Sequence, residues 1–425
     1  MKETIVRALH SGAYQSLFEK LYGEAAPLAP ARYEAAIHAF VSLYGDGEIS
    51  LFSAPGRSEI GGNHTDHQNG CVLAAAISVD MLAAVRKTDG KEIRITSRGY
   101  KPFALSLDSL SVNEAEFGTT QALVRGVLAG LSSRGYRIGG FDAYIDGAVP
   151  AGSGLSSSAA FEILIGTLLS GLYNEGKVDY KTLAIVGQEA ENTYFGKPSG
   201  LLDQMASACG GLVFIDFFDK KNPYVEGLSV DLSALGYGLA VVNTGGSHAD
   251  LTDEYAAIPH EMKQVSTHFG KENLAEVSKE DFLRELPALR GSLSDRALLR
   301  AMHFFLETVR AKEEAALLSR GDMEGFLRLV KQSGDSSFKY LQNLYAPKNA
   351  CEQGLPLGLA LTEELLRGEG ACRVHGGGFA GTIEVFLPLS MKEGYKKAIE
   401  TVFGEGSCLF LSIRPYGGIE VLPQE

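Results

Sequence analysis

The feature of this sequence that most restricts its fold is a run of small residues between an apolar strand and an apolar helix. The run extends from Pro150 to Ala160 and reads P-A-G-S-G-L-S-S-S-A-A. Residues 141–149 before it are typical of a strand, and the apolar residues that follow Ser157 recur at helical spacing. The sequence therefore predicts a glycine-rich loop that opens a helix.

A loop of this kind favours the binding of phosphate. Glycine lets the backbone approach a ligand closely, and the unpaired N–H groups and positive dipole end of a helix attract anions. Three consecutive serines add hydroxyl donors and a candidate Mg²⁺ ligand, but serine is also a frequent N-cap, so a plain helix start stays open. The residues that we predict to bind the phosphates of a nucleotide are Gly152, Gly154, Leu155, Ser156, Ser157, Ser158 and Ala159.

Other nucleotide-binding motifs are absent or lie in the wrong context. The sequence has no G-x-x-x-x-G-K-[ST], because each Gly-Lys pair is followed by Glu, Val or Pro. The H-R-D and D-F-G signatures of protein kinases are also missing. One G-x-G-x-x-G spans residues 376–381, but residues 382–387 after it alternate as a strand does, whereas a dinucleotide-binding fold needs a helix there.

Charge and hydrophobicity exclude several classes of protein. A formal charge of −13 repels nucleic acid and anionic lipid, so a phosphorylated ligand must be held by local donors. The longest apolar run, residues 71–79, is far shorter than the roughly 18 residues that indicate a membrane span. The N-terminus has no signal-peptide pattern and the five cysteines form no C-x-x-C pair, which predicts a cytoplasmic protein with reduced thiols.

The length of 425 residues indicates two lobes that share a cleft. Helical spacing predicts helices over residues 5–22 and 31–44, and the pattern changes to that of strands from residue 48. The later part is richer in predicted helices, at 294–342 and 357–366. We therefore expect an α+β fold with an N-terminal lobe over 1–220 and a C-terminal lobe over 221–425.

Three segments in one order resemble the motifs of the GHMP small-molecule kinases. They read A-P-G-R-S-E-I-G-G-N-H-T-D-H at 54–67, P-A-G-S-G-L-S-S-S-A-A at 150–160 and R-V-H-G-G-G-F-A-G at 373–381. Within that superfamily, E-N-T-Y-F-G-K-P-S-G-L-L-D-Q at 191–204 and V-N-T-G-G-S-H-A-D-L-T-D-E-Y at 242–255 are similar to galactokinases. The resemblance implies a two-lobed GHMP-kinase fold and a sugar 1-kinase that uses ATP and Mg²⁺.

The resemblance also implies roles for individual residues. Asp203 matches the catalytic aspartate that faces the anomeric hydroxyl, and Arg57 matches the arginine that stabilises developing charge. Ser157 and Glu191 match the Mg²⁺ ligands. The residues that match sugar contacts are His64, Asp66, Gly200 and Tyr255.

These roles suit phosphoryl transfer, which depends on alignment and neutralisation of charge. We expect Ser199 to cap a helix that carries Asp203 in its first turns. The dipole of that helix and the charge of Arg57 would lower the pKa of Asp203, leaving an ionised and modest base.

The sugar motif departs from the usual galactokinase pattern G-R-V-N-L-I-G-E-H-T-D-Y. Among other changes, Glu59 replaces asparagine, Gly61 replaces an aliphatic residue and Asn63 replaces glutamate. We predict that Asn63 contacts the sugar near C6. Galactose is favoured, but the Asn63 amide could also donate a hydrogen bond to a carboxylate at C6. The run Asp66-His67-Gln68 resembles galacturonate kinases, so galacturonate stays open.

A non-catalytic sensor of galactose and ATP is a further alternative. The complete S-S-S-A-A loop, together with Arg57, Glu191 and Asp203, favours an enzyme instead. We expect small-molecule partners, a sugar and ATP, with no nucleic acid and no membrane. The sequence leaves the oligomeric state open between a monomer and a weak dimer.

Overall fold

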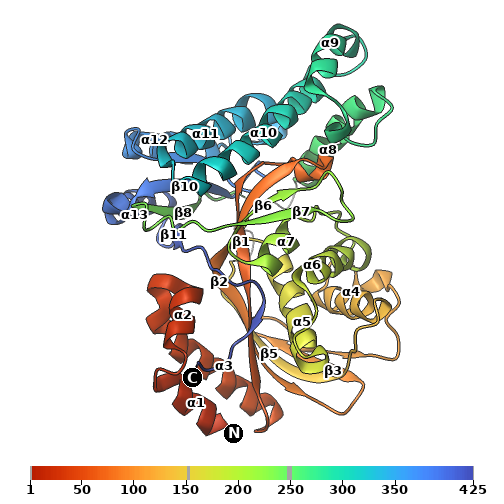
Figure 1. Cartoon of the computed structure of the whole chain (residues 1–425), viewed down its shortest axis with the longest axis vertical. Coiled ribbons are helices and arrows are strands. Elements are labelled where there is room, and N and C mark those ends of the chain that lie inside the picture. Colours follow the sequence, from red (N-terminus) through yellow and green to blue (C-terminus); the bar gives the residue numbers. More distant parts are fainter. Residues whose placement is uncertain (1, 151–153, 247–250, 425) are drawn as a thin grey trace.

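The computed structural model describes residues 2–150, 154–246 and 251–424 and contains two β-sheets with helices on their faces (Figure 1). The first sheet has eight strands and the second has four. The two termini lie near each other beside the first sheet (Figure 1). The α+β class predicted from the sequence is confirmed.

The first sheet is built around two long strands, β1 (Ser50–Gly61) and β2 (Cys71–Lys87). Its other strands are β3 (Glu92–Ser97), β4 (Phe103–Ser106), β5 (Phe141–Gly147), β6 (Leu212–Asp216), β7 (Tyr224–Leu228) and β12 (Ile419–Glu420). The main order is β12-β1-β2-β5-β3-β4. Strand β2 pairs with β1 on one side, and on the other it pairs first with β6 and then with β5.

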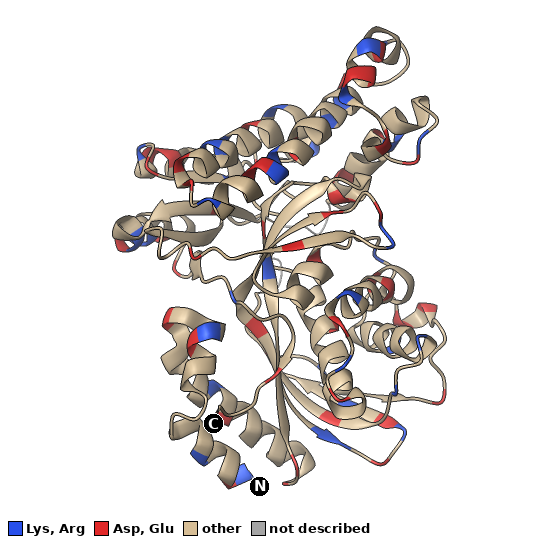
Figure 2. Cartoon of the chain, in the orientation of Figure 1, with Lys and Arg blue, Asp and Glu red and all other residues tan. Residues whose placement is uncertain are grey.

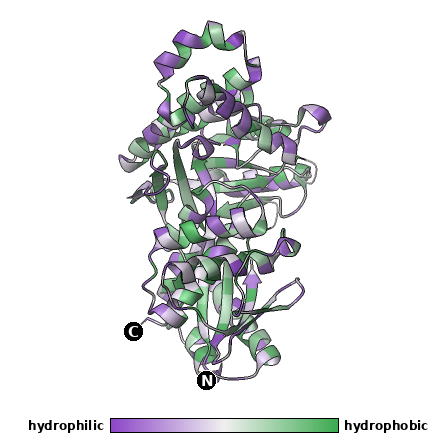
Figure 3. Cartoon of the chain, turned by 90° about the vertical axis from the view of Figure 1, so that its right-hand side faces the viewer, coloured by the Kyte–Doolittle hydropathy of each residue, from purple (hydrophilic) through white to green (hydrophobic). Residues whose placement is uncertain are grey.

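Helices cover both faces of this sheet. The helices on one face are α4 (Thr120–Ser133), α5 (Ser157–Asn174), α6 (Tyr180–Glu189) and α7 (Leu202–Cys209). The helices on the other are α1 (Lys2–His10), α2 (Gln15–Tyr22) and α3 (Ala29–Tyr44). Ala83 and Val85 of β2 join the core under α4–α7, and Leu82 and Ala84 join the core under α1–α3. The central strands, which are covered on both faces, are mainly apolar (Figure 3).

The second sheet has the antiparallel order β11-β8-β10-β9. Its strands are β8 (Tyr237–Asn243), β9 (Ala371–Val374), β10 (Thr382–Pro388) and β11 (Cys408–Leu411). Helices α10 (Asp295–Ser319) and α11 (Met323–Ser336) share a core with one face, and α12 (Gly354–Leu366) and α13 (Lys392–Phe403) share a core with the other. Helices α8 (Thr252–His268) and α9 (Lys279–Arg290) pack with α10 in a separate apolar cluster.

One core joins the two sheets. Leu73 of β2, Val241 of β8 and Ala311 of α10 lie in the same apolar cluster. The C-terminal segment returns to the first sheet, where Ile419 pairs with Ser53 of β1. The predicted boundary at residues 220/221 falls between β6 and β7, which pair with each other, so the division into lobes 1–220 and 221–425 stays a prediction.

The sequence predicts one helix over residues 5–22, but this segment forms two helices, α1 and α2. Gly12 between them adopts a φ of 88°, which a continuing helix does not allow.

Acidic and basic residues are interspersed over the outer helices (Figure 2). Among the residues that the structure describes, no helix is both long and apolar enough to cross a membrane.

A buried carboxylate, Asp80 of β2, ties the N-terminal helices and the C-terminal segment to the first sheet. Its Oδ1 accepts from the Arg32 guanidinium of α3 at 2.5 Å, and its Oδ2 accepts from the Tyr22 hydroxyl of α2 at 2.8 Å. The guanidinium of Arg414 lies 3.4 Å from Oδ2, and Asp80 and Arg414 are both fully buried. Burial opposes ionisation, but the two arginines outweigh it and lower the pKa of Asp80.

We expect Asp80→Asn to destabilise the protein by about 3–5 kcal/mol, because it leaves buried guanidinium charge without its partner. Since the pKa of Asp80 is lowered in the folded state, this stabilisation is present at neutral pH and is lost as the pH falls through the folded pKa. Urea unfolding at pH 7 measures the effect. Asp108→Asn, which breaks an exposed pair with Lys91, is the control, and equal unfolding midpoints for the two variants would contradict the prediction.

Candidate active site

The glycine-rich loop leads into α5, as the sequence predicts, and packs against β1. Gly154 has a φ of 70°, and the Leu155 carbonyl accepts the Arg57 N–H of β1 at 3.1 Å. Leu155 and Ala159 are buried. Gly152, which is also predicted to bind phosphate, lies outside the described residues.

Three parts of the chain meet at Asp203. Its Oδ1 accepts from Arg57 Nε at 2.7 Å, and its Oδ2 accepts from the Ser156 hydroxyl at 2.7 Å. The other end of the Arg57 guanidinium donates to the Gly154 carbonyl. Arg57 is 7% exposed, whereas a third of the Asp203 side chain is open to solvent. The carboxylate is thus held on both oxygens while one side stays accessible.

The pKa of Asp203 is lowered, as predicted. Burial raises it, but the charge and hydrogen bond of Arg57, the Ser156 hydroxyl and the ammonium of Lys197 together outweigh burial. Asp203 is therefore ionised at neutral pH.

The predicted cap of the helix that carries Asp203 is wrong. Helix α7 begins at Leu202, its N-cap is Leu201, and no side-chain hydrogen bond caps it within the described part of the chain. The hydroxyl of Ser199 donates instead to Oδ1 of Asn192, at 3.1 Å. The chain turns between Ser199 and α7, so the serine lies too early to reach the first N–H groups of the helix.

Glu191 lies in a short π-helix, Ala190–Phe195, and faces the start of α5 with 2% exposure. Its Oε1 accepts from the Ser158 hydroxyl at 3.1 Å and from Lys197 Nζ at 2.9 Å. Its Oε2 accepts from the amide of Gln204 at 2.9 Å. The serine that the structure pairs with Glu191 is therefore Ser158, whereas the sequence pairs it with Ser157.

A carboxylate and a hydroxyl at a helix start fit Mg²⁺, which is usually bound by one or two carboxylates and by substrate phosphates. Within the described ranges, no three His, Cys, Asp or Glu side chains gather to form an all-protein metal cage. These two groups would thus hold a Mg²⁺ ion only in part, and the phosphates of a nucleotide would supply further ligands.

The predicted sugar residues His64 and Asp66 lie in the turn between β1 and β2. His64 has a φ of 60°, and its Nε2 lies 2.9 Å from the Gly377 carbonyl. Burial and the neighbouring His67 lower the pKa of His64 to about 3, so the ring is neutral and donates through Nε2. Asp66 packs against Gly200, where a Cβ atom would lie 1.8 Å from its Oδ2.

Tyr255 reaches the same place from α8 and closes on the glycine-rich turn 376–381. Its hydroxyl donates to the Gly378 carbonyl at 2.8 Å, and its ring lies where a Cβ on Gly377 would be, 2.6 Å away. The structure thus brings His64 and Tyr255 to neighbouring carbonyls of one turn.

Asn63 differs from the prediction of a sugar contact. It is fully buried, and its amide donates to Glu59 Oε1 at 2.8 Å and to the Gly376 carbonyl at 2.7 Å. Its Oδ1 accepts from Ser337 and Asn343. The asparagine at 63 and the glutamate at 59 bond to each other, so this chain holds the two residue types of the family pattern in exchanged positions.

Several residues that sequence reasoning missed hold this arrangement from the second sheet. His375 Nε2 lies 3.0 Å from the Ser58 hydroxyl, and a Cβ on Gly154 would lie 3.0 Å from its Nδ1. From α10, His303 contacts the Asn63 carbonyl at 2.9 Å. No spacing signal marks these residues, because they lie more than 200 positions from their partners.

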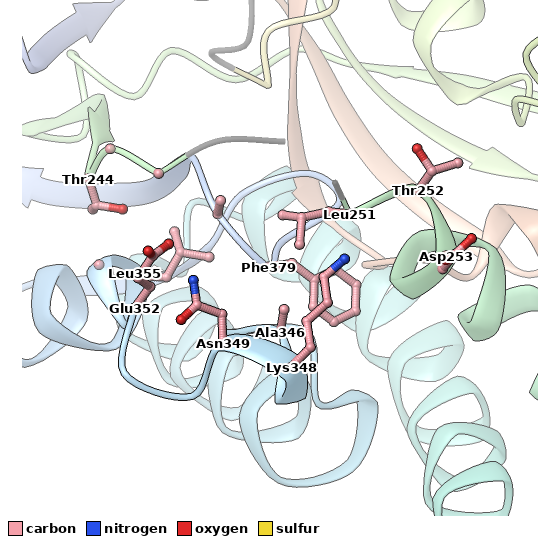
Figure 4. Close-up of a pocket in the computed structure, with 14 residues that line it drawn as sticks. Thr244, Leu251, Thr252, Asp253, Ala346, Lys348, Asn349, Glu352, Leu355 and Phe379 are labelled. Carbon is pink, nitrogen blue, oxygen red and sulfur yellow. The ribbon is translucent and has the colours of Figure 1, made fainter. Parts of the chain in front are cut away.

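A separate pocket of about 1010 Å³ lies beyond the glycine-rich turn (Figure 4). Phe379 forms one wall, Lys348 and Asn349 approach from a short 3₁₀ turn, and Thr252 and Asp253 stand at the start of α8. Among the described residues, none of those predicted to bind sugar or phosphate lines it.

Comparisons with known proteins agree with this geometry. Residues 122–211 match the model of the GHMP kinases N terminal domain, and residues 38–87 match the galactokinase galactose-binding signature. The first range contains the phosphate loop, Glu191 and Asp203, and the second contains Arg57 and the turn with His64.

The curated relatives include two galactokinases. That of Streptomyces coelicolor is 30% identical over 86% of this chain and 91% of its own length, and that of Clostridium tetani is 29% identical over the same shares. Among solved structures, Lactococcus lactis galactokinase complexed with galactose superimposes with a TM-score of 0.78 at 24% identity. That alignment covers 92% of this chain and all of the other, and it shows the same fold.

We expect Arg57→Gln to raise the pKa of Asp203, because Arg57 is the largest of the contributions that offset burial, and only Ser156 and Lys197 then oppose it. NMR titration of labelled aspartate carboxyls measures it. Arg290→Gln, which removes an exposed pair with Asp295, should leave the pKa of Asp203 unchanged. An unchanged value in Arg57→Gln would show that the guanidinium does not control this carboxylate.

Proposed function

Because this chain belongs to the galactokinase family of the GHMP kinases, we propose that it transfers the γ-phosphoryl group of ATP to the anomeric hydroxyl of galactose. The products are galactose 1-phosphate and ADP. The chain is an ATP-dependent phosphotransferase with an alcohol group as acceptor. The proposal rests on one observation: the Asp203 carboxylate is held by Arg57 and by Ser156 of the phosphate loop.

The donor side is the start of α5. The hydroxyl of Ser156 is used by Asp203 and not to cap α5, which leaves the first N–H groups of the helix to the phosphates of ATP. Ser157 and Ser158 add hydroxyl donors at the same place. Gly154 has no side chain, which lets His375 and Thr382 pack closely against its backbone.

Asp203 orients the anomeric hydroxyl and accepts its proton as the phosphoryl group is transferred. Because the pKa of Asp203 is lowered, it is a weak base, so its main contribution is to align the hydroxyl. Arg57 lies between Asp203 and the Gly154 carbonyl and stabilises negative charge that develops on the transferring group. Phosphoryl transfer requires little more of a protein than this positioning and neutralisation.

Mg²⁺ would be held by Glu191 and a serine hydroxyl of α5, either Ser157 or Ser158. When bound, it neutralises charge on the β- and γ-phosphates. Gln204 bonds the other oxygen of Glu191 and fixes the direction of the carboxylate.

The sugar would lie against His64, Asp66, Gly200 and Tyr255, next to Asp203 in α7. The neutral His64 is oriented by the Gly377 carbonyl and offers Nδ1 as an acceptor for a hydroxyl. The close approach of Gly200 leaves the Asp66 carboxylate no freedom on that side.

One of the two grounds for galacturonate was a free Asn63 amide near C6. Both hydrogens of that amide are donated, to Glu59 and to Gly376. The other ground, the resemblance of Asp66-His67-Gln68 to galacturonate kinases, stands alone, and galactose is the substrate that we propose. The cytoplasmic location and the oligomeric state, a monomer or a weak dimer, stay predictions.

Purified protein with Mg²⁺ and ATP should release ADP when galactose is added, and much less with galacturonate, N-acetylgalactosamine, arabinose or glucose. A coupled assay for ADP measures the rates. Asp203→Asn, which keeps the size of the side chain, should lose turnover while still binding nucleotide. Faster release with galacturonate, or binding of galactose without any release of ADP, would refute the proposed reaction.

We expect Gly200→Ala to raise the KM for galactose roughly tenfold to a hundredfold and to leave the KM for ATP unchanged. Its methyl group would occupy the place of the Asp66 carboxylate, and displacement of a contact residue by about 1 Å costs up to that factor. Steady-state kinetics with each substrate varied separately measures both constants.

Gly227→Ala is the matched control. Neither glycine has a positive φ, and a Cβ on Gly227 of β7 meets nothing within 4 Å. A normal KM for galactose in Gly200→Ala would remove Asp66 and Gly200 from the sugar site.

A further inference from the structure

The ammonium of Lys197 lies beside the predicted metal ligand, Glu191. Nζ donates to Glu191 Oε1 at 2.9 Å, and the same oxygen accepts from the Ser158 hydroxyl at the start of α5. The cation is thus next to the helix end that the phosphates of ATP would approach. Apart from lowering the pKa of Asp203, this charge has no part in the reaction proposed above.

The surroundings of Lys197 are acidic. The carboxylates of Glu191, Asp203 and Glu162 all act on its ammonium and raise its pKa, against the effect of burial. Glu162 is one turn after Ser158 on α5, is 1% exposed, and shares the amide of Gln204 with Glu191. Burial and the charge of Glu191 raise the pKa of Glu162 well above its ordinary value, so Glu191 and Asp203 are the carboxylates that would repel a polyphosphate unless cations accompany it.

The two ends of Lys197 differ in freedom. Its backbone N–H donates to the Glu191 carbonyl at 3.1 Å, and Gly196 before it has a φ of 83°, so the backbone is held in a tight turn. The side chain is 60% exposed and long enough to change its partner. The ammonium can therefore change its partner while the backbone of Lys197 stays in place.

The ammonium of Lys197 lies on the side of Glu191 that faces the phosphate loop. The oxygen that accepts from Lys197 is also the one bonded to Ser158 at the start of α5. A phosphate group bound at this helix end, with or without a metal ion, would compete with Glu191 for the ammonium.

We propose that Lys197 is a nucleotide-binding residue that neutralises Glu191 in the empty protein and contacts the phosphates of ATP or ADP once nucleotide is bound. The inference rests on the nucleotide-binding part of the proposed function and does not depend on which sugar is the acceptor. It gives this site a second positive charge besides Arg57.

The test measures the affinity for ADP by calorimetry in the presence of EDTA, so that no metal contributes. Lys197→Met should weaken the binding of ADP about tenfold or more, the loss expected for one charge-assisted contact, and Lys197→Arg should retain most of it. Lys177→Met, which removes the lysine of an exposed pair with Glu175, is the control and should bind as the wild type does. Wild-type affinity in Lys197→Met would overturn the proposal.

A double variant separates direct contact from simple neutralisation of Glu191. If Lys197 contacts phosphate, adding Lys197→Met to Glu191→Gln should still cost about tenfold in metal-free ADP affinity. If the lysine serves only to neutralise Glu191, the second substitution should cost nothing, and this result would also overturn the proposal. Both outcomes can be read even if galactose proves not to be the acceptor, because no sugar is present.

Discussion

The ion pair between Arg57 and Asp203 is the interaction on which the active site depends. It joins β1 to α7, and through the Gly154 carbonyl and the Ser156 hydroxyl it includes the phosphate loop. Arg57 is almost fully buried, so loss of Asp203 would leave its charge without compensation in a poorly solvated place. The ion pair therefore fixes the proposed catalytic carboxylate relative to the proposed phosphate loop, and such alignment is the main requirement of phosphoryl transfer.

The turn between β1 and β2, where we propose that the sugar binds, depends on the second sheet and on α10. Glu307 of α10 accepts from the N–H groups of Gly62 and Asn63, and His303 contacts the Asn63 carbonyl from the same helix. Arg373 of β9 donates to the backbone and side chain of Glu59 at 2.7 Å. A motif near residue 60 is therefore shaped by residues 240 to 314 positions later, and a change in α10 can alter the proposed sugar site without touching the sugar.

The exchange of glutamate and asparagine at positions 59 and 63 illustrates what local sequence misses. The pattern alone indicates a sugar contact at Asn63, because that is where the family places a carboxylate. In the fold, Glu59 meets the fully buried guanidinium of Arg373, and Asn63 can bond to Glu59 and to the turn at once. Burial of an arginine demands a carboxylate nearby, and which position supplies it depends on side-chain directions that a motif does not contain. The same limit explains why Ser199 does not cap α7 and why Glu191 meets Ser158.

The sequence by itself determined the phosphate loop, the helix that follows it, the α+β class and the residues that resemble a sugar kinase. These follow from local periodicity, from the conformational freedom of glycine and from motifs in a fixed order, all of which act over a few residues. Only the tertiary structure decided which hydroxyl donates to Asp203 and where the Asn63 side chain points. It also decided that Lys197 and Ser158 bond the same oxygen of Glu191. Those contacts depend on how distant elements pack, because a hydrogen bond requires atoms about 3 Å apart and spacing along the chain does not specify that distance.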